Sequence, residues 1–98
     1  MIVCEIGINH FGDIKYAKKY VDKIIEMKSD AISFHMLKDS FYAKNATNNK
    51  KKLPDEFYIN ARAITRKNNI QFGISIAEPN KIDFCEQIDV EFIVKSSW

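Results

Sequence analysis

A carboxylate, an amide and an imidazole follow one another closely after the first apolar run of the chain. Glu5 interrupts the apolar residues 2–6, and a carboxylate among apolar neighbours needs a partner or a bound ligand to offset its desolvation. Asn9 and His10 come next, between two glycines that allow backbone angles and close approaches which other residues block. The spacing of these side chains indicates a binding or catalytic site at the end of a buried strand.

The pattern Glu-Ile-Gly-x-Asn-His-x-Gly over residues 5–12 resembles the opening motif of the sialic acid synthase family. Enzymes of this family condense phosphoenolpyruvate with an N-acetylated amino sugar to form a nonulosonic acid, on a (β/α)8 barrel. The resemblance implies that Glu5 is the catalytic residue that contacts the sugar, and that Asn9 and His10 bind substrate. The structural alternatives are a carboxylate paired at a strand end for Glu5, a turn-former for Asn9 and a loop cap for His10.

Four apolar runs alternate with segments of helical periodicity, which predicts the order βαβαβαβ. We expect strands at 2–6, 31–37, 70–76 and 92–94, and helices at about 14–25, 53–68 and 81–87. Because parallel neighbours need a crossover connection, this order implies a parallel sheet covered by helices. The stretch 38–52 is polar, has no clear period and exceeds most connections in α/β units, which is typical of a lid, a binding loop or a disordered segment.

The two middle strands separate an apolar face from a small or polar face. At positions 31–37 and 70–76 the even residues are large and apolar, and most of the odd residues are small or polar. A barrel needs this asymmetry because its outer strand face packs on helices while its inner face lines the site. A doubly wound sheet carries helices on both faces and would be apolar on both. We therefore expect an α/β fold with four strands of a (β/α)8 barrel, a half barrel, in a single domain over residues 1–98.

The later motifs of the family are only partly kept. In the family the second strand carries an inward lysine and an inward glutamine, and these positions hold Ser33 and His35 here. The loss of the lysine weakens the expected attraction for phosphoenolpyruvate, because serine offers a hydrogen bond without charge. His35 points to the presumed site, and for a lone inward histidine we favour a structural hydrogen bond over a metal. In the third strand Ser75 stands where the family has a threonine that helps to bind phosphate.

The fourth strand leaves two alternatives for the inward lysine of the family. An alignment without gaps places Val94 at the lysine and Ser97 at a serine three residues later. If Phe92 and Val94 face the helices, Lys95 turns inward instead, and we prefer this interpretation because helical cover requires an apolar outer face. The resemblance then implies that Ser75, Lys95 and Ser97 hold the phosphate or carboxylate of phosphoenolpyruvate.

Composition and charge narrow the remaining classes of function. Fifteen basic and thirteen acidic residues give a net charge of +2, which is too weak and dispersed to favour nucleic acid. Cys4 and Cys85 have no metal-ligand spacing, and we expect both to be reduced and buried. No apolar stretch approaches the roughly 18 residues of a membrane span, and no signal peptide precedes the first strand, so we expect no membrane partner and a cytoplasmic protein.

The resemblance covers essentially the whole chain but only about half of the barrel of the family. In the complete family a divalent metal is held by two histidines on later strands, and we expect no metal in this chain alone. Four strands leave two unpaired edges, so we expect a homodimer or a fragment of a longer synthase. The expected function is that of a phosphoenolpyruvate-dependent transferase in truncated or degenerate form, weakly active or inactive. The alternatives are a non-catalytic sugar-binding or regulatory module and a flavodoxin-like interaction domain.

Overall fold

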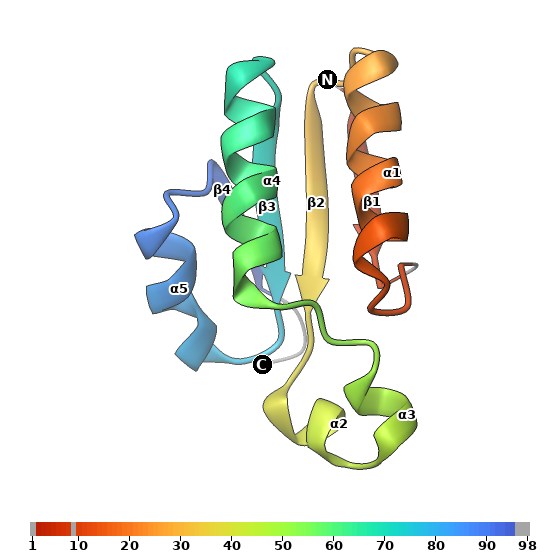
Figure 1. Cartoon of the computed structure of the whole chain (residues 1–98). Coiled ribbons are helices and arrows are strands. Elements are labelled where there is room, and N and C mark those ends of the chain that lie inside the picture. The colour runs from red at the N-terminus through yellow and green to blue at the C-terminus, as the bar shows by residue number, and fades with distance from the viewer. Residues whose placement is uncertain (1, 9, 96–98) are drawn as a thin grey trace.

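The structure, a computed structural model, describes residues 2–8 and 10–95. Its strands are β1 (Val3–Gly7), β2 (Ala31–Met36), β3 (Gln71–Ile76) and β4 (Phe92–Lys95), and its main helices are α1 (Ile14–Glu26), α4 (Asp55–Lys67) and α5 (Ile82–Gln87). The strands form one parallel sheet in the order β1-β2-β3-β4, with these three helices on the same side of it (Figure 1). The predicted parallel α/β fold is confirmed.

The order of the strands argues against the flavodoxin-like alternative. A flavodoxin-like sheet has the order 2-1-3-4-5 and carries helices on both faces, whereas here each strand pairs with the next one in sequence. Sequential parallel strands with helices on one side also occur in (β/α)8 barrels. Among the helices of the described residues, none is long and apolar enough to cross a membrane.

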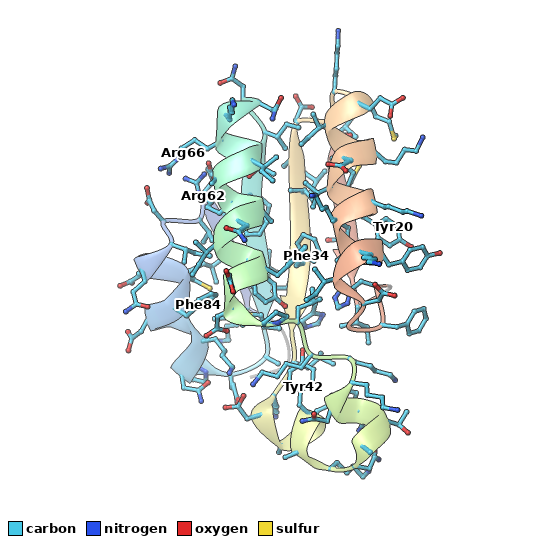
Figure 2. The ribbon with its side chains drawn as sticks, viewed as in Figure 1. Tyr20, Phe34, Tyr42, Arg62, Arg66 and Phe84 are labelled. Atoms are coloured by element: carbon cyan, nitrogen blue, oxygen red, sulfur yellow. The ribbon has the colours of Figure 1, made fainter. Side chains whose placement is uncertain are left out.

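The hydrophobic core lies between the sheet and the helices, as the alternation in β2 and β3 predicts. The ring of Phe34 packs against Phe57 and Tyr58 of α4, with centroid separations of 5.4 and 6.0 Å, and Figure 2 shows it between α1 and α4. Its strand neighbours on this side are Ile32, Met36, Phe72, Ile74 and Ile76, all buried. Burying each such side chain contributes roughly 1.5–3 kcal/mol, which fixes the side of the sheet that every residue of β2 and β3 faces.

The helix termini follow local sequence signals. Asp13 caps α1 by accepting a hydrogen bond from the Tyr16 N–H at 3.1 Å, as a short polar residue before a helix does. Helix α4 begins after Pro54, with two acidic residues in its first turn. The 3-10 turn η1 (Pro79–Lys81) leads into α5. Both cysteines are free, and Cys85 is buried as expected, whereas Cys4 is only partly buried.

The polar stretch 38–52 is folded and contains two short helices, α2 (Asp39–Ala43) and α3 (Ala46–Asn49). The Asn45 side chain caps α3 by accepting from the Asn48 N–H at 2.8 Å. The buried Tyr42 accepts from the Leu37 N–H at 3.1 Å and ties α2 to the end of β2. Figure 1 shows this helix pair beyond the carboxyl ends of the strands, which is the edge where barrel enzymes carry their sites.

Candidate functional site

The face of the sheet opposite α1, α4 and α5, which we call the open face, brings together the side chains singled out in the sequence. In a sheet, residues paired across neighbouring strands project to the same side. Glu5 pairs with Ser33 of β2, and His35 of β2 pairs with Ser75 of β3. Ser33 and His35 lie two residues apart and therefore share a face. The register thus places Glu5, Ser33, His35 and Ser75 on one face of three adjacent strands.

A β-bulge follows Glu5 near the end of β1. The register between β1 and β2 shifts between Glu5 and Gly7, and Ile6 is buried in the core. Gly7 has a φ of +59°, a conformation that glycine adopts without strain. Because successive residues of a strand face opposite sides, Glu5 is exposed on the open face while Ile6 packs under the helices. Bulges commonly re-aim a side chain next to active sites.

Burial favours the neutral form of the His35 imidazole. Burial lowers the pKa of His35 below its usual value, and the nearby carboxylate of Glu5 opposes part of this shift. A neutral imidazole has one N–H donor and one nitrogen acceptor. With the hydroxyl of Ser75 opposite it and the exposed carboxylate of Glu5 nearby, His35 completes a group of hydrogen-bonding side chains suited to a polar, hydroxylated ligand.

Lys95 does not join this group, and our preferred interpretation of the fourth strand is wrong. Val94 pairs with Ser75, and Lys95 pairs with the core residue Ile76, so Val94 shares the open face and Lys95 the opposite face. Phe92 lies over Gly73 on the open face, where a Cβ atom at position 73 would clash with the ring. The expectation that Phe92 must face the helices fails because a glycine opposite it makes room for the ring on the other side.

His10 lies inside the protein on the helix-covered side of the sheet. Its side chain is 1% exposed, and its ring lies 6.0 Å from that of Phe34. The Gly12 N–H donates to His10 Nδ1 at 2.8 Å, so the imidazole caps the loop. Burial lowers the pKa of His10, and the backbone of Gly7 opposes part of the shift. This geometry matches the structural alternative for His10 rather than contact with a ligand beside Glu5.

Gly12 fits the same loop against the segment before α4. Its φ is +78°, and a Cβ atom there would clash with the Lys50 carbonyl group. Asn9 and Ser97, the two other residues that the sequence singled out, lie outside the described residues.

A cavity of about 500 Å³ opens at the carboxyl ends of β2 and β3. His35 and Ala77 reach it from the strand ends, and Lys38, Ser40 and Lys44 reach it from α2 and its flanks. Sequence reasoning missed these three residues because the stretch 38–52 has no period and no match to a family motif. The position of the stretch, directly after a strand that bears a site residue, was the signal that could have found them.

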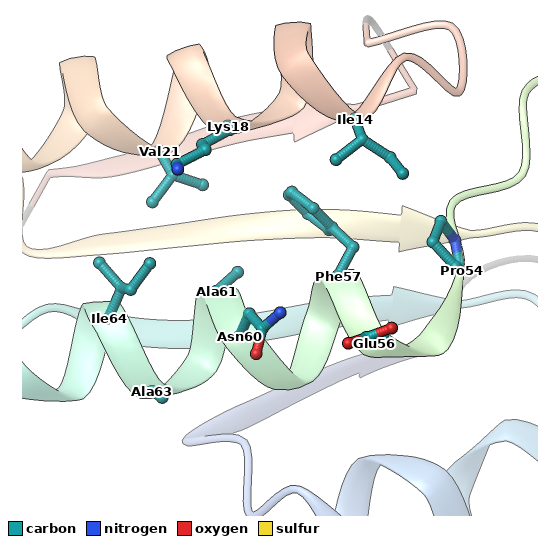
Figure 3. A pocket seen from close by; sticks show the side chains of 10 residues that line it. All are labelled: Ile14, Lys18, Val21, Pro54, Glu56, Phe57, Asn60, Ala61, Ala63 and Ile64. Carbon is teal, nitrogen blue, oxygen red and sulfur yellow. The ribbon is translucent and has the colours of Figure 1, made fainter.

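A second cavity, of about 560 Å³, lies between α1 and α4 on the helical side (Figure 3). Its lining is mostly apolar, with Val21, Phe57 and Ala61 among its residues. It is separated from Glu5 and His35 by the core and brings no catalytic group close to them.

The described residues offer no set of ligands for zinc or calcium. Nowhere in residues 2–8 and 10–95 do three or more His, Cys, Asp or Glu side chains gather as a metal-binding group. A structural or catalytic metal needs at least three protein ligands in most zinc sites and more oxygen ligands for calcium. Glu5 and His35 alone fall short of such a set.

No family model matches the chain, and no curated protein matches its sequence. Among solved structures, a similar one is the N-acetylneuraminic acid (sialic acid) synthetase from Leptospira borgpetersenii serovar Hardjo-bovis in complex with citrate, with a TM-score of 0.79 and 23% sequence identity. The match covers 94% of this chain and 34% of that one. At this identity the likeness shows a related fold, and this chain spans about a third of the length of that synthetase.

Proposed function

We propose that this chain forms four strands of a (β/α)8 barrel and binds the substrates of a sialic acid synthase-type condensation, an N-acetylated amino sugar and phosphoenolpyruvate. One observation carries the proposal: Glu5, His35 and Ser75 come from three adjacent strands and share the open face. The related fold of a sialic acid synthetase supports it. So does the motif over residues 5–12, which begins at Glu5 within β1.

The chemistry of these side chains suits the two ligands. The exposed carboxylate of Glu5 is an acceptor for the hydroxyl and amide donors of an amino sugar and orients it. The hydroxyl of Ser75 donates to a phosphate or carboxylate oxygen, and neutral His35 donates one N–H. In the proposed reaction the enol carbon attacks the sugar carbonyl, water adds to the resulting cation and phosphate leaves. We expect the isolated chain to be inactive or very weak, because the described residues position substrate but offer no set of metal ligands.

Calorimetry with an N-acetylated amino sugar tests the role of Glu5. Removing the charge in Glu5→Gln should weaken sugar binding about tenfold or more, because a hydrogen bond to a charged group is worth roughly 1.5–3 kcal/mol. The matched control is Glu86→Gln, which removes an exposed carboxylate from α5 on the other side of the sheet. Equal affinity of the folded Glu5→Gln variant and the original protein, or no sugar binding by either, would contradict the proposal.

A non-catalytic sugar-binding module is the second candidate. It is favoured by the loss of both strand lysines from the open face, since Ser33 replaces one and Lys95 faces the other way. Calorimetry distinguishes the two functions: binding of the sugar without phosphoenolpyruvate supports the module, and binding of both supports the synthase-type function.

We also propose that two copies of this 98-residue chain associate through their strand edges. β1 and β4 each have one neighbour in the sheet of the described residues, and an unpaired edge favours association. Pairing β4 of each copy with β1 of the other would close eight parallel strands around a twofold axis and enclose both open faces. Sedimentation should give twice the mass of the chain, and a folded monomer at all practical concentrations would contradict this association.

A further inference from the structure

Positive charge gathers at the carboxyl end of the sheet. The stretch 38–52 holds five lysines and a single acidic residue, Asp39, whereas the whole chain has a net charge of only +2. Asp39 is already engaged, because Lys81 Nζ lies 2.6 Å from its Oδ1. Lys81, with a smaller contribution from Lys52, lowers the pKa of Asp39. Because Lys81 lies outside the stretch, the five lysines of the stretch keep a positive field, which the Glu78 carboxylate beside the Asp39 N–H reduces by one charge.

Two of these lysines, Lys38 and Lys44, line the cavity at the ends of β2 and β3. They flank α2 on its two sides and are exposed. No ion pair within the described part of the chain involves either of them. Ser40, between them, adds a hydroxyl to the same cavity. The cavity therefore presents ammonium and hydroxyl donors to whatever enters it.

Helix α2 is tied to the neighbouring segments by three contacts. The Asp39 N–H donates to Glu78 Oε1 at 2.8 Å, and Lys81 bridges to the Asp39 carboxylate. Both contacts tie α2 to the segment that follows β3. On the other side of α2 the Tyr42 hydroxyl accepts from the Leu37 N–H. Donors that are already in position lose less entropy when a ligand binds.

We propose that Lys38 and Lys44, with Ser40, form a binding site for the phosphate or carboxylate group of a small ligand. The site replaces the positive charge that Ser33 and Lys95 do not bring to the open face. An ammonium group is a compact charge that suits phosphate, and about 500 Å³ is within the usual size range of small-molecule sites. The proposal rests on the proposed function for its choice of phosphoenolpyruvate as ligand. His35 lines both the cavity and the open face, so the proposed anion site adjoins the proposed sugar site.

The test is a titration of the full chain with inorganic phosphate at constant ionic strength, followed by amide NMR signals. The signals of Ser40, Lys44 and Ala77 should shift with saturation. The double variant Lys38→Gln/Lys44→Gln should weaken phosphate binding by roughly two- to fivefold for each lysine removed, because pairs between exposed charges contribute about 0.2–1 kcal/mol. The matched control Lys19→Gln/Lys67→Gln removes the same charge from exposed positions on α1 and α4 and should bind phosphate like the original protein.

Unchanged phosphate affinity in the double variant, equal weakening in the control, or shifts without saturation would overturn the proposal. Titrations with phosphoenolpyruvate and pyruvate show which anionic group the site binds. Binding of phosphoenolpyruvate and phosphate that depends on the two lysines assigns the site to phosphate. Binding of pyruvate that depends on them assigns the site to carboxylate. Tighter, length-dependent binding of heparin would show a non-specific polyanion surface and would also overturn it.

The same variants distinguish a failure of the anion-site proposal from a failure of the proposed function. Loss of phosphate binding with intact sugar binding in Lys38→Gln/Lys44→Gln supports both. Lysine-dependent phosphate binding by a protein that binds no sugar supports the anion site and contradicts the proposed function. Sugar binding together with phosphate binding that is independent of these lysines supports the proposed function and overturns the anion site.

Discussion

The substitution Arg62→Met tests how the fourth strand is attached to the rest of the fold. Arg62 is 4% exposed, and its Nε donates to the Asp89 carbonyl at 2.6 Å. Its guanidinium also lies 3.3 Å from Glu91 Oε1. Glu91 in turn joins β3, because its Oε2 accepts from the Phe72 N–H at 2.9 Å and its N–H donates to the Phe72 carbonyl at 2.8 Å. Arg62 therefore connects α4 to the segment that leads into β4 through a hydrogen bond and an ion pair.

The expected loss of stability follows from these contacts. Methionine keeps the apolar stem of the side chain but removes a charge-assisted hydrogen bond, worth roughly 1.5–3 kcal/mol. It also leaves Glu91 without its arginine partner, although the partial exposure of this carboxylate screens most of that cost. We expect the free energy of unfolding to fall by about 2–3 kcal/mol, which for a domain of this size lowers the melting temperature by roughly 8–24 °C.

Urea unfolding measures this loss, and Arg66→Met is the matched control. Arg66 belongs to the same helix, and Figure 2 shows both arginines on the side of α4 that faces β4. Its guanidinium lies 2.8 Å from Asp89 Oδ2, but the side chain is 58% exposed, and exposed ion pairs contribute at most about 1 kcal/mol. Equal losses in the two variants would refute the argument that burial makes Arg62 the stronger contact.

The loop, the histidines and the register each give a further prediction. Gly12→Ala should lower the free energy of unfolding more than Gly7→Ala, since both have a positive φ but only position 12 also brings a clash; urea unfolding should give about 1 kcal/mol for Gly7→Ala and more for Gly12→Ala. Burial lowers the pKa values of His10 and His35 in the folded state, so the unfolded chain binds more protons than the folded chain below pH 6.5. The free energy of unfolding should therefore fall when the pH is lowered from 7 to 5. Equal free energies of unfolding at the two pH values would contradict the buried, neutral state of these histidines. Lys95→Ala should leave phosphate affinity unchanged, because this side chain faces away from Ser75, and a tenfold loss in the NMR titration would reverse the assigned register.

The parallel sheet was predictable from the alternation of strands and helices, and the side that each residue of β2 and β3 faces was predictable because it depends on burial alone. Even positions such as Phe34 and Phe72 are fully buried, and large apolar residues at a period of two leave one orientation for each strand. The face of the sheet on which Glu5 lies was predictable for the same reason, since its pairing with Ser33 continues that alternation into β1.

The sequence-based predictions failed where a residue on another element determines the orientation or the burial of a side chain. Phe92 turns to the open face because Gly73, on another strand, leaves space for its ring, and the sequence of β4 alone does not show this. The helices in the stretch 38–52 depend on single contacts such as the Asn45 cap rather than on periodicity. For His10 the motif indicates a ligand contact, while its burial beside Phe34 is a property of tertiary packing.

The most direct test of the central claim is an amide NMR titration of the original chain with an N-acetylated amino sugar. The claim is that Glu5, His35 and Ser75 form one ligand-binding face. The account predicts saturable shifts that gather at these residues and Ser33, with the outer face of α1 and α4 unchanged. Saturable shifts confined to the cavity between α1 and α4, or no shifts at any sugar concentration, would contradict it.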